Sequence, residues 1–336
     1  MPRADDAPGV RHAALCGRHV LVTGATGFVG RHVVAALCDA GCRVRAAVRR
    51  PPAGAATWPA SVETCEVGEL GPGTDWAAAL AGIDAIVHAA AHVHVMRPGP
   101  EDDATFERVN VQATRRLAEQ AARAGVPRLV FISSVMVNGE DSGPRAFRTE
   151  DDPHPVNAYA RSKLAAEALL LRSATGPAPR MAVVRPPLVY GPGVGGNFAR
   201  LIRACARGWP LPLAAVDNRR SLISVWNLAD FVLLLLWHPQ APGRVWLVSD
   251  GEDVSTPDLL RRTAAAMGRR AQLVAVPTAF LNGMARFAGL GPELRRLTGT
   301  LTVDAGPARR ELGWSAPLSL DAGLARTLAT AAGRAR

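Results

Sequence analysis

The chain has 336 residues, of which 48% are hydrophobic and 20% charged, a composition that predicts a folded protein with a sizeable core. Its net charge of +10 comes from dispersed arginines and aromatic residues make up only 5%, so no segment resembles a nucleic-acid-binding surface. The apolar run 231–237 is too short to span a bilayer, and residues 1–10 lack the apolar core of a signal peptide. We therefore expect a cytoplasmic protein without a membrane span or a nucleic-acid partner, whose basic surface suits an anionic small substrate.

Five cysteines are scattered along the chain, at positions 16, 38, 42, 65 and 205. Cys38 and Cys42 have no second pair of ligands at the spacing of a zinc site, so we predict no metal. We interpret all five as small core residues in a reducing compartment.

The first half of the chain alternates apolar strands with helices. The predicted strands are 18–24, 43–48, 84–91, 128–134 and 181–191. The predicted helices are about 28–41, 103–124 and 157–172. Buried strands that alternate with helices indicate an α/β fold, a Rossmann-type doubly wound parallel sheet.

After about residue 191 the pattern loosens into loops, a helix at 227–239, a strand at 243–250 and a helix that opens at Ser255. We predict a small, mainly helical C-terminal substrate lobe. The expected division is a disordered lead-in at 1–14, a Rossmann domain at 15–190 to which 226–249 returns, and a substrate-binding lobe at 191–225 and 250–336.

The turn between the first strand and helix reads TGATGFVG, with Gly24, Gly27 and Gly30 in a GxxGxxG spacing. Glycines at such a turn let the backbone approach a pyrophosphate at the helix N-terminus, which predicts a dinucleotide site. The alternative is a tight turn that serves packing alone.

The end of the second strand bears on the choice of dinucleotide. An acidic residue there binds the ribose hydroxyl of NAD, whereas arginine accommodates the 2′-phosphate of NADP. Arg49 and Arg50 occupy this position without a carboxylate, which favours NADP over NAD. Two solvated surface arginines are the alternative interpretation.

The segment YARSK, residues 159–163, contains Lys163, the only lysine in the sequence. It follows Tyr159 by four residues, so on a helix the phenol and the amine share one face. A compact ammonium is not readily replaced by the broad guanidinium that serves everywhere else in this chain. The pair is therefore a candidate for proton transfer.

These motifs occur in a fixed order: TGATGFVG, VHAAA at 87–91, Asn110 in NVQAT, FISS at 131–134 and YxxxK. Together they resemble the extended short-chain dehydrogenase/reductases over about residues 18–316. The chain is most similar to the bacterial NAD(P)-dependent nucleotide-sugar epimerases and reductases, the UDP-glucose 4-epimerase-like group.

The resemblance implies roles for individual residues. Tyr159 is the catalytic acid and base on the sugar oxygen, Ser134 orients the sugar, and Lys163 binds the nicotinamide ribose and lowers the pKa of the phenol. Ser133 is expected to be structural. The implied cofactor-binding residues are Gly24, Gly27, Phe28, Val29, Gly30, Arg49, Leu70, Ala89, Ala90, Lys163 and Pro186.

The implied substrate is a UDP-sugar. Its expected contacts are Ser134, His94, Asn197 and Arg220, with the uracil ring against 208–213. Asn197 and Arg220 match the diphosphate-binding positions, although an exposed pair of Arg219 and Arg220 is the alternative. The chain has Asn227 where the family has aspartate, and Arg296 is the nearest match to a later arginine. His92 and His94 invite a metal interpretation, but no further ligand follows at a suitable spacing.

Ser134, Val135 and Met136 stand where related dehydratases carry Thr-Asp-Glu. Because the Asp–Glu pair that would supply an acid and a base for water elimination is missing, we reject dehydration. We expect a UDP-4-keto-6-deoxy-N-acetylhexosamine reductase of polysaccharide synthesis, with a UDP-glucose or UDP-N-acetylglucosamine 4-epimerase as the alternative. A steroid-type dehydrogenase and a non-catalytic NADP-sensing regulator are rivals on the same fold. The resemblance also suggests a homodimer formed by the helices at 103–124 and 157–172.

Overall fold

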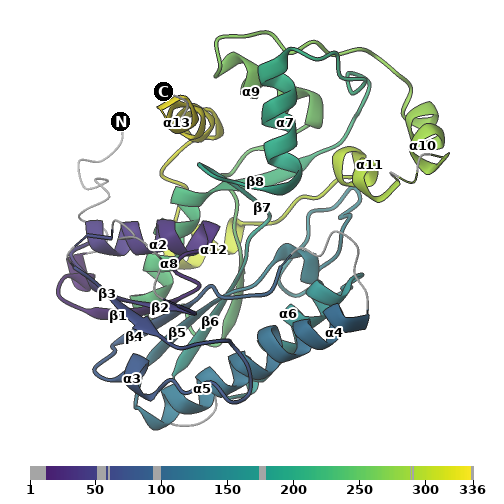
Figure 1. The fold of residues 1–336 in the computed structure, drawn as a ribbon. Coiled ribbons are helices and arrows are strands. Elements are labelled where there is room, and N and C mark those ends of the chain that lie inside the picture. Colours follow the sequence, from purple (N-terminus) through teal and green to yellow (C-terminus); the bar gives the residue numbers. More distant parts are fainter. Residues whose placement is uncertain are drawn as a thin grey trace.

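The computed structural model describes residues 13–50, 58–59, 61–93, 100–173, 179–287, 289 and 291–333. Its centre is a parallel sheet of seven strands in the order β3-β2-β1-β4-β5-β6-β9 (Figure 1). These strands are β1 (His19–Thr23), β2 (Arg43–Val48), β3 (Val62–Glu66), β4 (Ala85–His88), β5 (Arg128–Ile132), β6 (Arg180–Arg185) and β9 (Arg244–Leu247). The order reverses between β1 and β4, and in such sheets ligands bind at the carboxyl ends of the strands beside this point.

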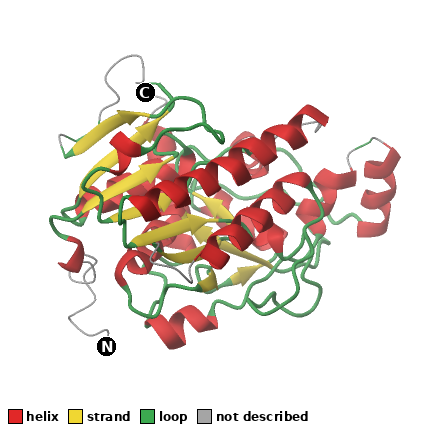
Figure 2. Ribbon diagram, turned by 90° about the horizontal axis from the view of Figure 1, so that it is seen from below, coloured by secondary structure: helices red, strands yellow, loops and turns green. Residues whose placement is uncertain are grey.

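Helices cover both faces of the sheet, as Figures 1 and 2 show. One face carries α2 (Phe28–Asp39), α8 (Val225–Trp237) and α12 (Gly306–Leu312). The other carries α3 (Ala77–Leu80), α4 (Pro100–Phe106), α5 (Ala113–Arg123) and α6 (Ala158–Ser173). The predicted doubly wound α/β fold is therefore confirmed.

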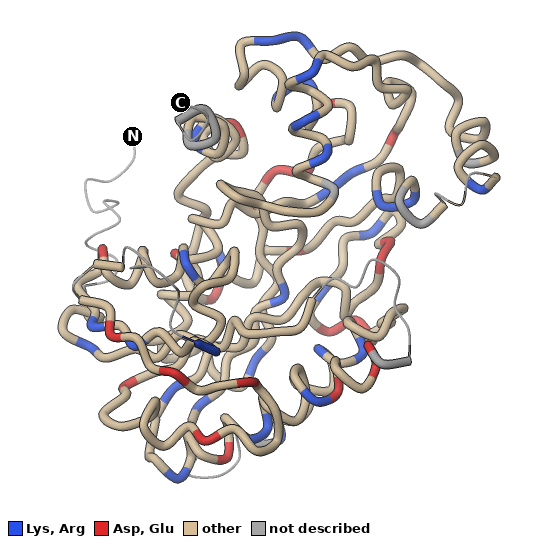
Figure 3. Tube along the Cα trace, in the orientation of Figure 1, with Lys and Arg blue, Asp and Glu red and all other residues tan. Residues whose placement is uncertain are grey.

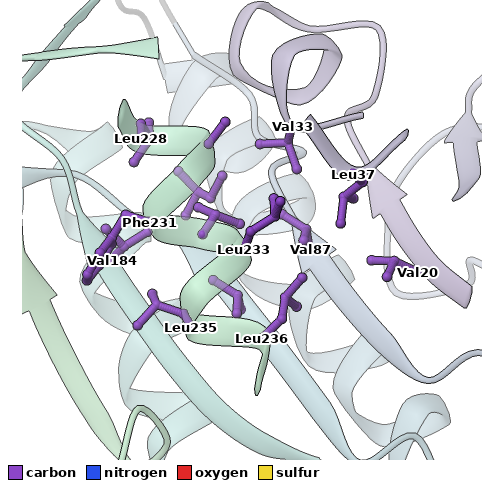
Figure 4. Close-up of a cluster of buried hydrophobic side chains, with 14 of the residues drawn as sticks. Val20, Val33, Leu37, Val87, Val184, Leu228, Phe231, Leu233, Leu235 and Leu236 are labelled. Atoms are coloured by element: carbon purple, nitrogen blue, oxygen red, sulfur yellow. The ribbon is translucent and has the colours of Figure 1, made fainter. Parts of the chain in front are cut away.

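The helix α8 supplies much of the larger core cluster (Figure 4). Leu233 points towards Val87 of the sheet and towards Val33 of α2, and Phe231 lies beside Val184 of β6. Nearly every side chain of α8 is apolar, which explains why this helix is buried from end to end.

A second lobe lies beyond the carboxyl ends of the strands (Figure 1). Its small sheet pairs β7 (Leu188–Tyr190) in parallel with β8 (Arg220–Ser224), and β8 in antiparallel with β10 (Asp253–Val254). Its helices are α7 (Gly196–Arg207), α9 (Thr256–Ala265), α10 (Thr278–Phe287), α11 (Gly291–Thr298) and α13 (Leu320–Gly333).

Several local predictions differ from the structure. The predicted strand 181–191 is two strands, because Pro186 and Pro187 have no N–H to continue the ladder. The predicted helix 103–124 is interrupted by a π-helical segment, Glu107–Gln112. The strand β3 and the short α3 were not predicted, and Cys16 is exposed rather than in the core.

The packing of α12 bears on the division into lobes. Although it follows residue 250, α12 contributes Ala308 and Leu312 to the core cluster beneath α8, and Trp314 donates a hydrogen bond to Asp230. This segment thus packs on the Rossmann sheet, whereas we expected it in the second lobe. The two-lobe boundary as a whole stays a prediction.

Candidate active site

The glycine turn after β1 packs directly against the end of β4. Gly24 has a φ of +66°, and a Cβ placed there would lie 2.7 Å from the backbone nitrogen of Ala90. A Cβ on Gly30 would lie 2.0 Å from the carbonyl oxygen of Gly24, so both positions require glycine. Gly27 caps α2 without a side chain, so no side-chain cap covers the N–H groups of the first turn, a chemistry that suits a diphosphate.

A buried chain of hydrogen bonds leads from this turn across the sheet. Thr23 Oγ1 accepts from the N–H of Ala90 and pairs with Nδ1 of His88 at 2.7 Å. The other ring nitrogen of His88 pairs with Thr114, whose hydroxyl donates to the carbonyl of Asn110. Burial lowers the pKa of His88 to about 3, so this histidine is neutral and bridges the two threonines.

The amide of Asn110 continues this chain to α6. Its oxygen accepts from the backbone of His92, and its nitrogen donates to the His92 carbonyl and, at 2.9 Å, to Ser162 of α6. Ser162 donates in turn to the carbonyl of Tyr159. Asn110 lies in the π-helical segment, where the extra residue of the turn accompanies a buried, fully bonded amide.

Tyr159 meets Ser134 at the carboxyl end of β5. The two hydroxyl groups form a hydrogen bond, and Ser134 also accepts from the backbone N–H of Met136. Burial raises the pKa of Tyr159 to about 12, and only the bond with Ser134 opposes this. The pair suits proton exchange with a substrate oxygen placed between the two hydroxyls.

Lys163 lies one turn further along the same face of α6. Only 2% of the residue is exposed, and its ammonium donates to the carbonyl of Ile132 at 2.8 Å and lies 4.3 Å from the centre of the Phe131 ring. Burial lowers the pKa of Lys163 to about 7, against a raising effect of Glu167. We expected its charge to lower the pKa of Tyr159; an amine only partly charged at neutral pH contributes little, and burial dominates.

Sequence reasoning missed a buried ion pair beneath Lys163. Glu167 accepts three hydrogen bonds from the guanidinium of Arg185, the shortest at 2.6 Å, and one from the hydroxyl of Ser133. Arg185 also donates to Asn138. The spacing of Tyr159, Lys163 and Glu167 at intervals of four was the available signal, since all three share one face of α6.

The other residues predicted to bind the cofactor lie at the same edge of the sheet. Phe28 and Val29 begin α2, and Ala89 and Ala90 follow β4 beside Gly24. Pro186 follows β6 and accepts from the N–H of Val135. Leu70 follows β3 and is half-buried. Arg49 is exposed at the end of β2, 3.7 Å from the carboxylate of Glu69, so an acidic group does stand near this arginine.

The residues predicted to bind the substrate differ in their exposure and in their contacts. Arg220 is half-buried on β8 and donates to the carbonyl of Gly299 at 3.0 Å; burial lowers its pKa and Asp141 opposes this. Arg219 is exposed and donates to the carbonyl of Asp253. Asn197 lies in the first turn of α7, and His94 lies outside the described residues.

A cavity of about 450 Å³ lies in the second lobe. Its lining includes Trp209, Leu211 and Leu213 from the segment predicted to meet the uracil ring. Three arginines of α7 also line it: Arg200, Arg203 and Arg207. An apolar wall with cationic groups suits a flat ring attached to an anionic diphosphate.

Two further residues have packing roles. Tyr190 packs in the core of the second lobe and donates to Asp250 at 2.7 Å. Asn227 donates to Asp250 and to the carbonyl of Leu318, so it joins α8 to the chain before α13. Arg296 is exposed on α11.

No helix among the described residues is long and apolar enough to cross a membrane. Within the same residues, no group of three or more histidine, cysteine, aspartate or glutamate side chains could hold a metal ion.

A parallel sheet with a glycine turn at its reversal point and a Tyr–Lys pair at its carboxyl edge defines a Rossmann-fold enzyme of the short-chain dehydrogenase/reductase superfamily. Residues 20–249 match the model of the NAD-dependent epimerase/dehydratase family, and the chain belongs to this family. The recognition from sequence motifs is thereby confirmed.

Relatives and solved structures agree with this assignment. The chain is 38% identical to a UDP-glucose 4-epimerase of Vibrio cholerae, covering 92% of this chain and 94% of that protein. It is 31% identical to a 3-beta-hydroxysteroid dehydrogenase of Mycolicibacterium neoaurum, covering 75% and 70%. MoeE5, solved in complex with UDP-glucose and NAD, is 28% identical with a TM-score of 0.75, covering 95% of this chain and all of that chain.

Proposed function

We propose that the protein transfers hydride at C4 of a UDP-sugar. The observation that carries the proposal is the hydrogen bond between Tyr159 and Ser134, at the edge of the sheet where Gly24 meets Ala90. A bound nicotinamide cofactor supplies or accepts the hydride. Tyr159 then exchanges the proton of the C4 oxygen, Ser134 orients that oxygen, and Lys163 binds the ribose of the cofactor.

Within this chemistry we favour the reduction of a 4-keto sugar, as in UDP-4-keto-6-deoxy-N-acetylhexosamine. Its support is the exposed Arg49 and Arg50 at the end of β2, which suit the 2′-phosphate of NADP, the cofactor of net reductions. The ion pair between Arg49 and Glu69 weakens this preference for NADP. It does not remove it, because Arg50 offers a second guanidinium beside Arg49.

A 4-epimerase is the second candidate, favoured by the similarity to the Vibrio cholerae protein. An epimerase oxidises C4, turns the sugar and returns the hydride, so it consumes no cofactor overall. A steroid-type dehydrogenase would not need Arg220, which we expect to bind a diphosphate, and this disfavours it. The Tyr159–Ser134 pair likewise argues against a non-catalytic regulator.

The test is to incubate the purified protein with UDP-glucose and with UDP-N-acetylglucosamine, each with NAD⁺ or NADP⁺, and with a UDP-4-keto-6-deoxy sugar, with NADH or NADPH. Oxidation of the reduced cofactor by the keto sugar supports the reductase. Interconversion of C4 epimers with no net change of the cofactor supports the epimerase. No turnover of any UDP-sugar would refute the proposal. Light scattering on the same sample tests the expected homodimer.

A further inference from the structure

The helix α10 presents large apolar side chains to solvent. Phe280, Met284 and Phe287 are 61%, 58% and 98% exposed, and their spacing places them on a narrow stripe of the helix. Leu281, which lies beside this stripe, is buried in the core of the second lobe. The helix is therefore fixed to the lobe through one side, and its stripe is additional apolar surface.

Exposed apolar side chains concentrate at this place. Elsewhere in the described residues the exposed large hydrophobic side chains are Val93, Val156, Leu188, Trp209 and Val274. Among the described helices, only α10 carries three exposed large hydrophobic side chains, and two of these are phenylalanines. Figure 1 shows α10 at the outer end of the second lobe, away from the central sheet. Three exposed apolar side chains on one stripe of a helix at such an end indicate an interaction surface.

The chain around this stripe is strongly basic. Residues 269–296 contain five arginines and one glutamate, and all five arginines are exposed: Arg269, Arg270, Arg286, Arg295 and Arg296. Figure 3 shows lysine and arginine positions, in blue, along the second lobe. Phenylalanines on one side of a short helix, with Arg286 on the same helix and Arg295 and Arg296 on the following α11, are typical of helices that lie in the interface of an anionic bilayer.

We propose that the exposed stripe of α10 docks the protein on the surface of an anionic lipid bilayer. The apolar side chains enter the boundary between headgroups and acyl chains, and the arginines contact lipid phosphates. A second copy of the chain fits less well, because a symmetric contact would bring the arginines of both copies together. The ten-residue helix lies on the bilayer and does not span it.

The experiment is flotation of the full-length protein with vesicles of phosphatidylcholine alone or with 30% phosphatidylglycerol, in low and high salt. We expect at least tenfold more protein on the anionic vesicles, with most of this excess lost in high salt. The variant F280S/M284S/F287S should lose at least tenfold in binding. The matched control is V156S, because Val156 is as exposed as Met284 but lies far from α10 in the sequence and next to the catalytic helix; it should bind normally.

Thermal unfolding and circular dichroism of each variant establish that it is folded. Phe287→Ser alone serves if the triple variant does not fold, because a side chain 98% exposed has few contacts to lose. Equal binding to both vesicles, no binding at all, or undiminished binding of the α10 variants would overturn the proposal. So would a loss of self-association in these variants, since it would identify a second copy as the partner.

Discussion

The helices α8 and α6 cover opposite faces of the same sheet and bury opposite kinds of side chain. The buried residues of α8 are apolar except for Asn227 at its start, whereas α6 buries Lys163 and Glu167. Burying a charge is costly unless it is paired, and Glu167 is paired with Arg185 and Ser133. The helix α8 thus serves mainly to pack the sheet, whereas holding ionisable groups at the site costs α6 some stability.

The largest expected effect tests the catalytic side of this comparison. Tyr159→Phe removes the hydroxyl that exchanges the substrate proton, so turnover should fall by about 10²–10⁴-fold. Steady-state kinetics with the substrate found above measure the loss. The control is Leu236→Ala on α8, which should cost about 2–5 kcal/mol in stability and leave turnover of the folded enzyme near normal. Normal turnover of Y159F would refute the site.

Replacing the buried charge of α6 by a side chain like those of α8 should raise stability. Lys163→Met should be inactive but unfold at a higher temperature at pH 7, with a gain on the order of 2–4 kcal/mol. The folded protein lowers the pKa of Lys163 to about 7, so between pH 7 and about 10 it binds fewer protons than the unfolded chain. Wild-type stability therefore rises with pH in this window, and the advantage of K163M should shrink.

Thermal and denaturant unfolding at several pH values measure this effect. The same gain at pH 7 and at pH 10 would contradict it, as would a loss of stability at both.

The ion pair beneath Lys163 should set the upper pH limit of activity. The carboxylate of Glu167 raises the pKa of Lys163, so Glu167→Gln should lower it. If charged Lys163 is needed, kcat/KM falls as pH rises through this pKa, and in E167Q that fall should occur at lower pH. Glu119→Gln on the exposed face of α5 makes the same chemical change and should not shift the profile.

A smaller kcat at every pH, with an unchanged profile shape, would instead assign Glu167 a purely structural role. In that case Glu167 would contribute only to stability, as the buried leucines of α8 do, and the proposed difference between the two helices would be wrong.

Much of the sheet and the site could be predicted from the sequence, because apolar strands, a glycine turn and a Tyr–Lys pair are local patterns. What could not be predicted depends on contacts distant in sequence. The π-helical segment around Asn110 satisfies a hydrogen bond to Ser162, 52 residues away. The pairing of Glu167 with Arg185 joins a helix to a neighbouring strand. The lowered pKa of Lys163 follows from burial, which no motif records.

The smallest expected effect concerns the exposed end of β2, which has neither the packing of α8 nor the buried charges of α6. If Arg49 contacts the 2′-phosphate of NADP, Arg49→Ala should weaken the preference for NADPH over NADH by about fivefold, because an exposed ion pair is worth at most about 1 kcal/mol. The contact should also weaken as salt rises. Arg123→Ala, an exposed arginine at the end of α5, is the matched control. An unchanged cofactor ratio in R49A would leave Arg49 as the partner of Glu69 alone and would favour NAD, and with it the epimerase.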